Sequence, residues 1–321
     1  MRKLRALLGL LGAAALQFTF AADPYPSRPI RFLVPGASGS SQDVLSRVVA
    51  NKLSQQLNQQ VIVDVRAGAS GVIGIELGKA AAPDGYTIVA ATSTLFASLP
   101  ALKQHLSYDP DRDFAPLSRM AMVANVMTVN AGLGVETVAD FVKLAKTKPG
   151  QLNYGSAGIG STHHLTMEAM KSALHLDITH IPYRGTSQAV PALLGNHVQV
   201  LWASYPNLKA GVEGGRIRLL ANNGLGRSPL LPELPPLADI IAGFDMVSVI
   251  GVYGRAGTPE AIVRKIAAEA GAIMNQPEMK SALAPLGMEP VGEGPGPFAK
   301  MIAQEINSIT KVVQGVGLRA K

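Results

Sequence analysis

The sequence predicts an α/β protein with two lobes that are joined by a pair of crossing strands. Short runs of β-branched residues alternate with helical patterns along most of the chain, an order typical of parallel sheets covered by helices on both faces. A strand, a loop of small residues and a helix start follow one another in each half of the chain, about 120 positions apart. Two long apolar runs without an adjoining helix predict the crossing strands, and a chain of 321 residues is long enough for two domains.

Residues 1–22 predict a secretory signal peptide. Arg2, Lys3 and Arg5 form a basic start, residues 7–16 are apolar, and the segment 19–21 resembles a cleavage site with small residues. The apolar stretch is shorter than the roughly 18 residues that a membrane helix needs, and no later stretch reaches that length. We therefore expect a protein that is exported to the periplasm.

The composition favours a small anionic ligand over a nucleic acid. Without the three basic residues of the signal peptide the formal net charge falls from +7 to +4, and aromatic residues make up only 5% of the chain, with no basic cluster that interleaves them. The chain has no Cys, which excludes disulfides, thiolate metal ligands and a cysteine lipid anchor. We expect no nucleic-acid partner, no metal and no cofactor.

The first lobe is predicted to open with alternating strands and helices, each assigned from its apolar spacing. These elements are a strand at 30–34, a helix over 44–57, a strand at 61–63, a helix over 72–82 and a strand at 87–89. The same alternation returns in the second half of the chain. There we expect a strand at 152–154, a helix around 165–170, a strand at 178–181 and a helix over 187–194.

Two apolar runs, Met120 to Val129 and Met246 to Tyr253, have no helix close enough to complete an ordinary crossover unit. We interpret them as paired strands, on which the chain leaves the first lobe near Asn125 and returns to it near Val247. The two predicted lobes are then residues 24–125 plus 247–321, and residues 126–246. The C-terminal helices expected at 259–274 and 297–313 would pack back on the first lobe.

Two loops rich in Gly and Ser are candidates for a ligand site. The segments 35–43 (PGASGSSQD) and 155–162 (GSAGIGST) each follow a predicted strand and precede a predicted helix. A helix N-terminus has unpaired N–H groups and partial positive charge, so such loops favour an anion. Alignment of the loops superposes Ser41 on Ser161, and we expect both to cap their helices. Ligand oxygens are expected at the N–H groups that follow Gly39 and Gly158.

Other chemistries fit these residues less well. The second loop lacks the Lys that follows the last Gly of a nucleotide-binding loop. His163 and His164 are adjacent, so they point roughly 100° apart on a helix, and no carboxylate completes a metal set with them. Ser156 or Ser161 with a nearby His would be a hydrolase pair, but the chain has no G-x-S-x-G motif. We therefore expect binding without catalysis.

Three further side chains have roles that the sequence defines only in part. Arg66 is expected to fix its own loop. For Arg184, which precedes a predicted helix, contact with the ligand and a purely structural role stay open. Trp202 follows a predicted strand, where it would be either a wall of the cleft or part of the core.

Eight short segments occur in a specific order and spacing, although each alone is weak. They are residues 25–30 (YPSRPI), 66–74 (RAGASGVIG), 82–86 (APDGY), 108–116 (YDPDRDFAP), 148–150 (KPG), 152–161 (LNYGSAGIGS), 180–185 (HIPYRG) and 256–259 (AGTP). With these segments the mature chain resembles, over nearly its whole length, the extracytoplasmic solute receptors of tripartite tricarboxylate transporters, the Bordetella uptake gene (Bug) family.

The resemblance implies a clamshell of the type II periplasmic-binding-protein kind, with two crossing hinge strands. It implies a small carboxylate ligand, a membrane permease as partner and a monomeric receptor. A receptor for periplasmic signalling with the same fold and, less readily, an exported hydrolase are alternatives. The ligand-binding residues implied are Gly36, Ala37, Ser38, Gly39, Ser40, Ser41, Thr92, Ser93, Thr94, Ser156, Ala157, Gly158, Gly160, Ser161, Thr162 and Ala203.

Several positions depart from the family pattern toward smaller or less polar residues. They are Gly36, Ala37, Ala203, Val249 and Ile250. Since each change removes volume or polarity, the sequence predicts a wider, more apolar pocket, unless Trp202 and Tyr205 refill the space. Such a pocket favours a monocarboxylate or amide with an apolar or aromatic body, because extra buried apolar area contributes about 25 cal/mol per Å².

Overall fold

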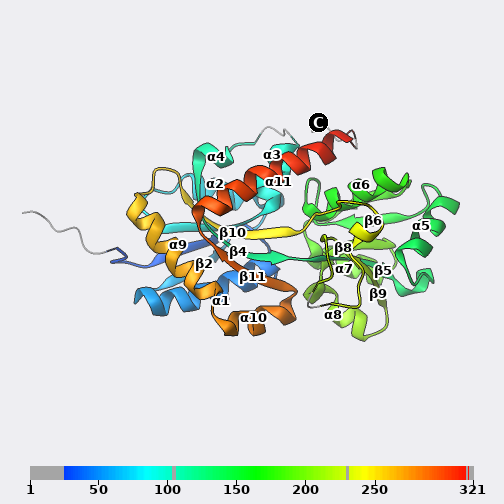
Figure 1. Ribbon diagram of the computed structural model, residues 1–321, viewed down its shortest axis with the longest axis horizontal. Coiled ribbons are helices and arrows are strands. Elements are labelled where there is room, and N and C mark those ends of the chain that lie inside the picture. The colour runs from blue at the N-terminus through cyan, green and yellow to red at the C-terminus, as the bar shows by residue number, and fades with distance from the viewer. Residues whose placement is uncertain (1–24, 103–105, 229–230, 316, 318–321) are drawn as a thin grey trace, which may run out of the picture.

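The computed structural model in Figure 1 shows an elongated α/β molecule with two sheets side by side along its long axis. It describes residues 25–102, 106–228, 231–315 and 317, so the predicted signal peptide at 1–22 lies outside the described residues. None of the described helices is long and apolar enough to cross a membrane.

The first sheet has six strands in the order β11-β4-β10-β3-β1-β2. Their bounds are β1 Ile30–Val34, β2 Val61–Val65, β3 Thr87–Thr92, β4 Phe114–Val123, β10 Ser248–Arg255 and β11 Met288–Glu293. Strands β1, β2 and β3 are parallel, as expected from the alternating strands and helices. Strands β10, β4 and β11 join them in antiparallel pairing.

The second sheet has five strands in the order β7-β6-β8-β5-β9. Their bounds are β5 Asn125–Asn130, β6 Asn153–Ser156, β7 Thr179–Pro182, β8 Val200–Ser204 and β9 Ile217–Asn222. Strand β6 is parallel to β7 and β8, whereas β5 is antiparallel to β8 and β9. The parallel pairing expected from the alternating strands and helices is therefore present in part of each sheet, beside antiparallel pairs. Strands that carry the chain out of one sheet and back into it run in opposite directions, which makes both sheets mixed.

The crossing strands predicted from the two apolar runs are present. The run Met120 to Val129 divides at Ala124 into the end of β4 and the start of β5, and β10 pairs with β4 from Ser248 opposite Val123. Strands of the first sheet thus come from residues 30–123 and 248–293, and those of the second from residues 125–222. Since the expected lobe boundaries lie beside these junctions, we propose that lobe 1 is 24–125 plus 247–321 and lobe 2 is 126–246.

Helices cover both faces of each sheet. On the first sheet, α1 (Ser41–Leu57), α9 (Glu260–Met274) and α10 (Pro277–Leu283) share one apolar cluster, and α2 (Val72–Lys79) and α11 (Pro295–Gly315) belong to another. On the second sheet, α7 (Thr186–Leu194) and α8 (Tyr205–Glu213) lie opposite α5 (Val138–Thr147) and α6 (Thr162–Leu174). The shorter helices are α3 (Leu99–Ala101) and α4 (Pro110–Asp113).

Helix α11 connects the two halves of the molecule. It packs on β4 of the first sheet, as the sequence predicts, and also contacts α6, which covers the second sheet. Figure 1 shows it running along the top of the molecule toward α6. The apolar cluster on this side is accordingly continuous from one sheet to the other.

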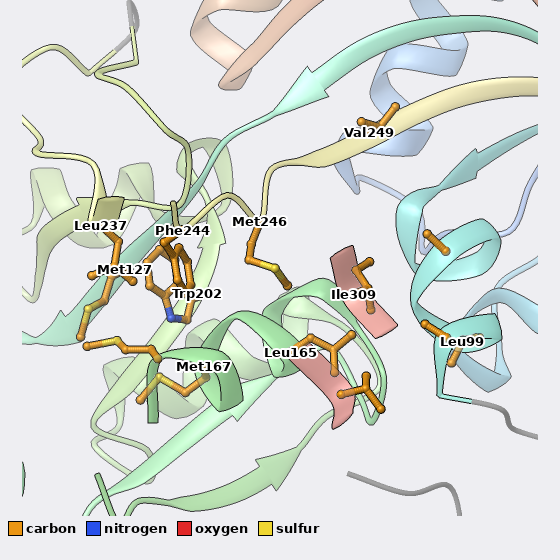
Figure 2. Packing of buried hydrophobic residues seen from close by; sticks show 14 of the residues in the cluster. Leu99, Met127, Leu165, Met167, Trp202, Leu237, Phe244, Met246, Val249 and Ile309 are labelled. Atoms are coloured by element: carbon orange, nitrogen blue, oxygen red, sulfur yellow. The ribbon is translucent and has the colours of Figure 1, made fainter. Parts of the chain in front are cut away.

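Trp202 belongs to this cluster and is fully buried. Figure 2 shows its indole among Met127, Met167, Phe244 and Met246. Of the two roles left open by the sequence, the structure assigns Trp202 to the core, so its side chain does not refill a ligand pocket.

Candidate functional site

A cavity of about 220 Å³ lies between elements of the two sheets. The first sheet contributes the segment 35–42 and the residues Ala67, Gly68, Ser70, Gly71, Thr92, Thr94 and Leu95 to its lining, and the crossing strands contribute Val123, Asn125, Ser248 and Ile250. The second sheet contributes Ala157, Ser161, Thr162, His163, Arg184, Gly185, Thr186, Ser187, Ser204 and Asn207. Since drug-sized ligands usually occupy about 300–1,000 Å³, this cavity suits a compact molecule.

Four helices begin at this cavity. The N-cap residues of α1, α6, α7 and α8 are Ser40, Ser161, Gly185 and Ser204, and all four line the cavity. Each helix is at least nine residues long, so its N-terminus adds positive potential there. The sequence predicted two such termini, at α1 and α6. The structure adds those of α7 and α8.

Free backbone donors are available at these N-termini. The N–H groups of Ser41, Gln42 and His163 make no hydrogen bond with the described part of the chain. By contrast, the N–H group of Ser40, which follows Gly39 and was predicted to hold the ligand, donates to the carbonyl of Ala37 at 3.1 Å. The available donors at the first loop therefore lie one and two residues later than expected.

The predicted caps are correct for one helix and displaced by one residue for the other. Ser161 Oγ accepts from the His164 N–H at 3.2 Å, so it caps α6 as expected. On α1, however, it is Ser40 that accepts from the Asp43 N–H, at 3.3 Å. Helix α1 already includes Ser41, whose hydroxyl points across the cavity instead. Ser40, and not Ser41, is thus the counterpart of Ser161.

Hydroxyl groups meet across the cavity. Ser41 Oγ lies 3.1 Å from Ser204 Oγ. Thr94 Oγ1 lies 3.4 Å from Thr162 Oγ1 and also accepts a long hydrogen bond from the Thr162 N–H. In each pair one residue follows a strand of the first sheet, and the other ends or follows a strand of the second. The two sides of the cavity are therefore in direct polar contact.

Eleven of the sixteen residues predicted for the site line this cavity. They are Gly36, Ala37, Ser38, Gly39, Ser40, Ser41, Thr92, Thr94, Ala157, Ser161 and Thr162. The other five do not. Ser93 is buried and accepts from the Val249 N–H, and Ser156 is fully buried beneath its loop. Gly158 and Gly160 form the backbone turns of that loop, with φ of +117° and +78°.

Ala203 differs from the prediction because strand residues alternate between the faces of a sheet. Its side chain is fully buried in the apolar cluster under α7 and α8, beside Val126. The next residue, Ser204, ends β8 and lines the cavity, where it also accepts from Asn207 Nδ2 at 2.9 Å. A Ser that is followed two positions later by Pro206 is a helix-start signal, and this signal could have identified Ser204.

The departures from the family pattern contribute less to the lining than expected. Gly36, Ala37 and Ile250 line the cavity, whereas Ala203 and Val249 do not. Val249 lies on the opposite side of β10 from Ile250, within the apolar cluster that contains Met246. The wider, more apolar pocket stays a prediction, with two of its five positions outside the described lining.

The charges around the cavity suit an anion. The described lining contains no Asp or Glu, and its one Lys or Arg is Arg184, which is exposed. Burial lowers the pKa of His163 to about 4, so this imidazole is neutral near pH 7. Its Nδ1 atom is buried and has no hydrogen-bond partner among the described residues. Arg66 does not line the cavity and is paired with Asp64 at 2.8 Å, as expected for a residue that fixes its loop.

A two-lobed α/β fold with two crossing strands, and a cavity between the sheets into which helix N-termini point, define a solute-binding protein of the clamshell class. Comparison with known proteins agrees. The family model described as the tripartite tricarboxylate transporter family receptor matches residues 45–318. The chain belongs to this family, whose members are periplasmic receptors.

Three similar proteins illustrate the family. BugT of Bordetella pertussis is 30% identical, with 100% of this chain and 99% of BugT aligned. The structure of Rpa4515 of R. palustris with adipate is 32% identical, with a TM-score of 0.87 and 91% and 98% of the two chains covered. The structure of MatC from Rhodopseudomonas palustris with bound malate is 25% identical, with a TM-score of 0.82 and 90% and 100% covered.

Proposed function

We propose that this receptor is exported, binds a compact carboxylate in the described cavity, and delivers it to the membrane subunits of a tripartite transporter. The observation that carries the proposal is the convergence of four helix N-termini on one cavity of about 220 Å³. Backbone N–H groups and hydroxyls there are suited to carboxylate oxygens, and no described acidic side chain of the lining repels them.

Aliphatic dicarboxylates are the ligand class that we favour. Two relatives of similar fold carry such acids, adipate in Rpa4515 and malate in MatC. A compact acid also suits the size of the cavity, and hydroxyl groups on both sides of it provide partners for two carboxylates. We rank these acids ahead of the aromatic monocarboxylates that the substitutions at Gly36 and Ile250 favour.

Binding without catalysis is part of the proposal. Ser156 Oγ does lie 2.7 Å from His180 Nε2, the geometry of a nucleophile and its base. Ser156 is nevertheless fully buried, and neither residue lines the cavity. A substrate held in the cavity would therefore not reach the hydroxyl, which supports a receptor over an exported hydrolase.

Calorimetry on the purified protein tests the ligand class. The panel comprises adipate, succinate, malate, citrate, several aromatic monocarboxylates, and adipamide as a neutral counterpart of adipate. We expect at least one aliphatic dicarboxylate to bind at least about tenfold more tightly than adipamide, since charge-assisted hydrogen bonds are the stronger ones. Tighter binding of an aromatic acid would support the wider pocket instead, and equal binding of adipate and adipamide would contradict an anion site.

A pair of variants tests the location of the site. Ser204→Ala removes a hydroxyl from the cavity, and we expect it to weaken dicarboxylate binding about fivefold to tenfold. Thr147→Ala removes an exposed hydroxyl near the end of α5, outside the cavity, and serves as the matched control. Equal affinities of the two variants would show that Ser204 is not part of the site.

A further inference from the structure

The loop between β6 and α6, residues 157–161, brings Ala157 and Ser161 to the cavity. Two of its backbone donors are held by side chains outside the lining. The Gly158 N–H donates to Ser156 Oγ at 3.1 Å, and the Gly160 N–H donates to His164 Nδ1 at 3.2 Å. Both glycines have positive φ, so these hydrogen bonds hold the loop in a conformation that few other residues adopt.

His164 is itself fixed by a stack of rings. Its imidazole lies 4.3 Å from that of His180, which in turn lies 4.6 Å from the ring of Tyr154, measured between centroids. The three rings come from α6, β7 and β6. Tyr154 Oη donates to Glu168 at 2.6 Å, and Lys171 pairs with the same carboxylate. The stack therefore ties the loop to two strands and to the helix that follows it.

The hydrogen bond from Gly160 defines the proton state of His164. An N–H donor needs a lone pair on Nδ1, so His164 must be neutral there and carry its proton on Nε2. Burial lowers the pKa of His164, and of His180 to about 4. Among the charged groups that face the pair, Glu168 acts to raise both pKa values and Lys171 to lower them. Ser156 Oγ completes the cluster through His180 Nε2.

We propose that His164 is a positioning residue of the ligand site, which holds the loop 157–161 in its binding conformation through the Gly160 N–H and is supported by the stacked His180. The importance for affinity rests on the proposed function, because the loop carries Ala157 and Ser161 to the cavity. Protonation of Nδ1 would turn an acceptor into a donor facing the Gly160 N–H. The loop is then released as the pH falls, and ligand affinity falls with it.

The test uses hydrogen exchange of the Gly160 amide in ligand-free protein, so it does not depend on the identity of the ligand. His164→Leu removes the acceptor, and we expect the protection of this amide to fall about tenfold at neutral pH. His164→Asn keeps an acceptor close to the Nδ1 position and cannot be protonated, so we expect it to retain most of the protection. Unchanged protection in folded His164→Leu protein would overturn the proposal.

The pH dependence gives a second, independent readout. In the wild type we expect protection at Gly160, corrected for intrinsic exchange, to decrease as the pH falls below about 6.5, because burial lowers the pKa of His164 from the ordinary value of a histidine. In His164→Asn it should stay constant over this range. If His164→Leu does not fold, this comparison decides the question, since parallel pH profiles of wild type and His164→Asn would refute the role of His164. Adipate calorimetry on the same variants then tests the link between the loop and affinity. If none of the proteins binds adipate, adipate is the wrong ligand, and the role of His164 in the loop is not affected.

Discussion

At the residue scale, neighbouring serines at the start of α1 have different roles. Ser40 caps the helix, while Ser41 lies in its first turn and faces Ser204 across the cavity. We expect Ser40→Ala to lower the free energy of unfolding by about 0.5–2 kcal/mol, as loss of an N-cap does, and Ser161→Ala to behave alike. We expect Ser41→Ala to leave stability within about 0.5 kcal/mol and to weaken ligand binding.

Urea unfolding and calorimetry on the same three variants measure both effects. Ser161→Ala is the matched control for loss of a cap, because its hydroxyl accepts the equivalent bond on α6. If Ser41→Ala were as destabilising as Ser40→Ala, the division of roles between the two serines would be wrong.

Glu305 gives the stability of the protein a pH dependence. Burial, with a contribution from Asp245, raises its pKa to about 7, although Ser93 and Arg119 act in the opposite direction. Between about pH 4.5 and about pH 7 only the unfolded state ionises this carboxyl, so the native state loses stability as the pH rises. We expect Glu305→Gln to remove this loss, on the order of 2 kcal/mol after allowance for screening.

The prediction is checked by urea unfolding of both proteins at several pH values. The gain from Glu305→Gln should be small near pH 4.5 and greatest above about pH 7. Taking the difference between variant and wild type removes the contribution of the buried histidines, whose lowered pKa values act in the acid range. A gain that is the same at every pH would show that Glu305 is not held protonated by burial.

At the scale of elements, the loop before α6 has little room for a side chain. A Cβ at Gly158 would lie 3.2 Å from Ser70 Oγ, on the first-sheet side of the cavity, and the φ of +117° already disfavours other residues. We expect Gly158→Leu to lower ligand affinity at least about tenfold while lowering stability by about 1–2 kcal/mol, because the side chain separates the two sides of the cavity.

Gly134 offers a control for backbone strain alone. It has φ of +70°, and a Cβ at this position would meet no atom of the described residues within 4 Å, so Gly134→Leu should lower stability without affecting affinity. Calorimetry and urea unfolding separate the two effects. Unchanged affinity in folded Gly158→Leu protein would remove this loop from the site.

The order of elements was predictable from the sequence because apolar spacing and loop composition report on local structure. The strand at 30–34, the helix over 187–194 and the paired crossing strands all occur where expected. The direction of β10 and β11 in the first sheet was not accessible, since pairing between distant strands depends on tertiary packing. The extension of α11 to α6 also arises from tertiary contact rather than from local pattern.

Within the site, the main errors are displacements by one residue. The cap of α1 is Ser40 rather than Ser41, and the cavity residue at the end of β8 is Ser204 rather than Ala203. A shift of one position in a strand moves a side chain to the opposite face, and in a helix start it exchanges a capping hydroxyl for one that faces the cavity. Amino-acid composition identifies such a loop, but the role of each serine hydroxyl depends on the conformation of the first helical turn, which composition does not define.

At the scale of the whole molecule, both connections between the sheets meet at a buried pair of asparagines. The Asn223 side-chain carbonyl accepts from the Asn125 N–H at 2.9 Å, and the Asn223 N–H donates to the Asn125 carbonyl at 3.0 Å. Asn125 Nδ2 also donates to Ser248 at 3.2 Å, where β10 begins. These contacts hold the two crossing strands together at the point where the chain passes from one sheet to the other, which is the position expected of a hinge.

A disulfide across the cavity tests whether the sheets move apart about this hinge to admit ligand. Ser41 Oγ and Ser204 Oγ are 3.1 Å apart on opposite sides, and the chain has no Cys of its own. The double variant Ser41→Cys, Ser204→Cys should therefore form one disulfide on oxidation.

Loss of both hydroxyls weakens binding, so the reduced double variant is the reference. Oxidised with a bound dicarboxylate, the variant should release it at least about tenfold more slowly than after reduction, because the crosslink prevents opening. If it is oxidised in the absence of ligand, the double variant should bind the dicarboxylate at least about tenfold more slowly than the reduced double variant does. Mass spectrometry verifies the crosslink and stopped-flow displacement measures the rates; equal rates in the crosslinked and reduced protein would mean that ligand enters without separation of the two sheets.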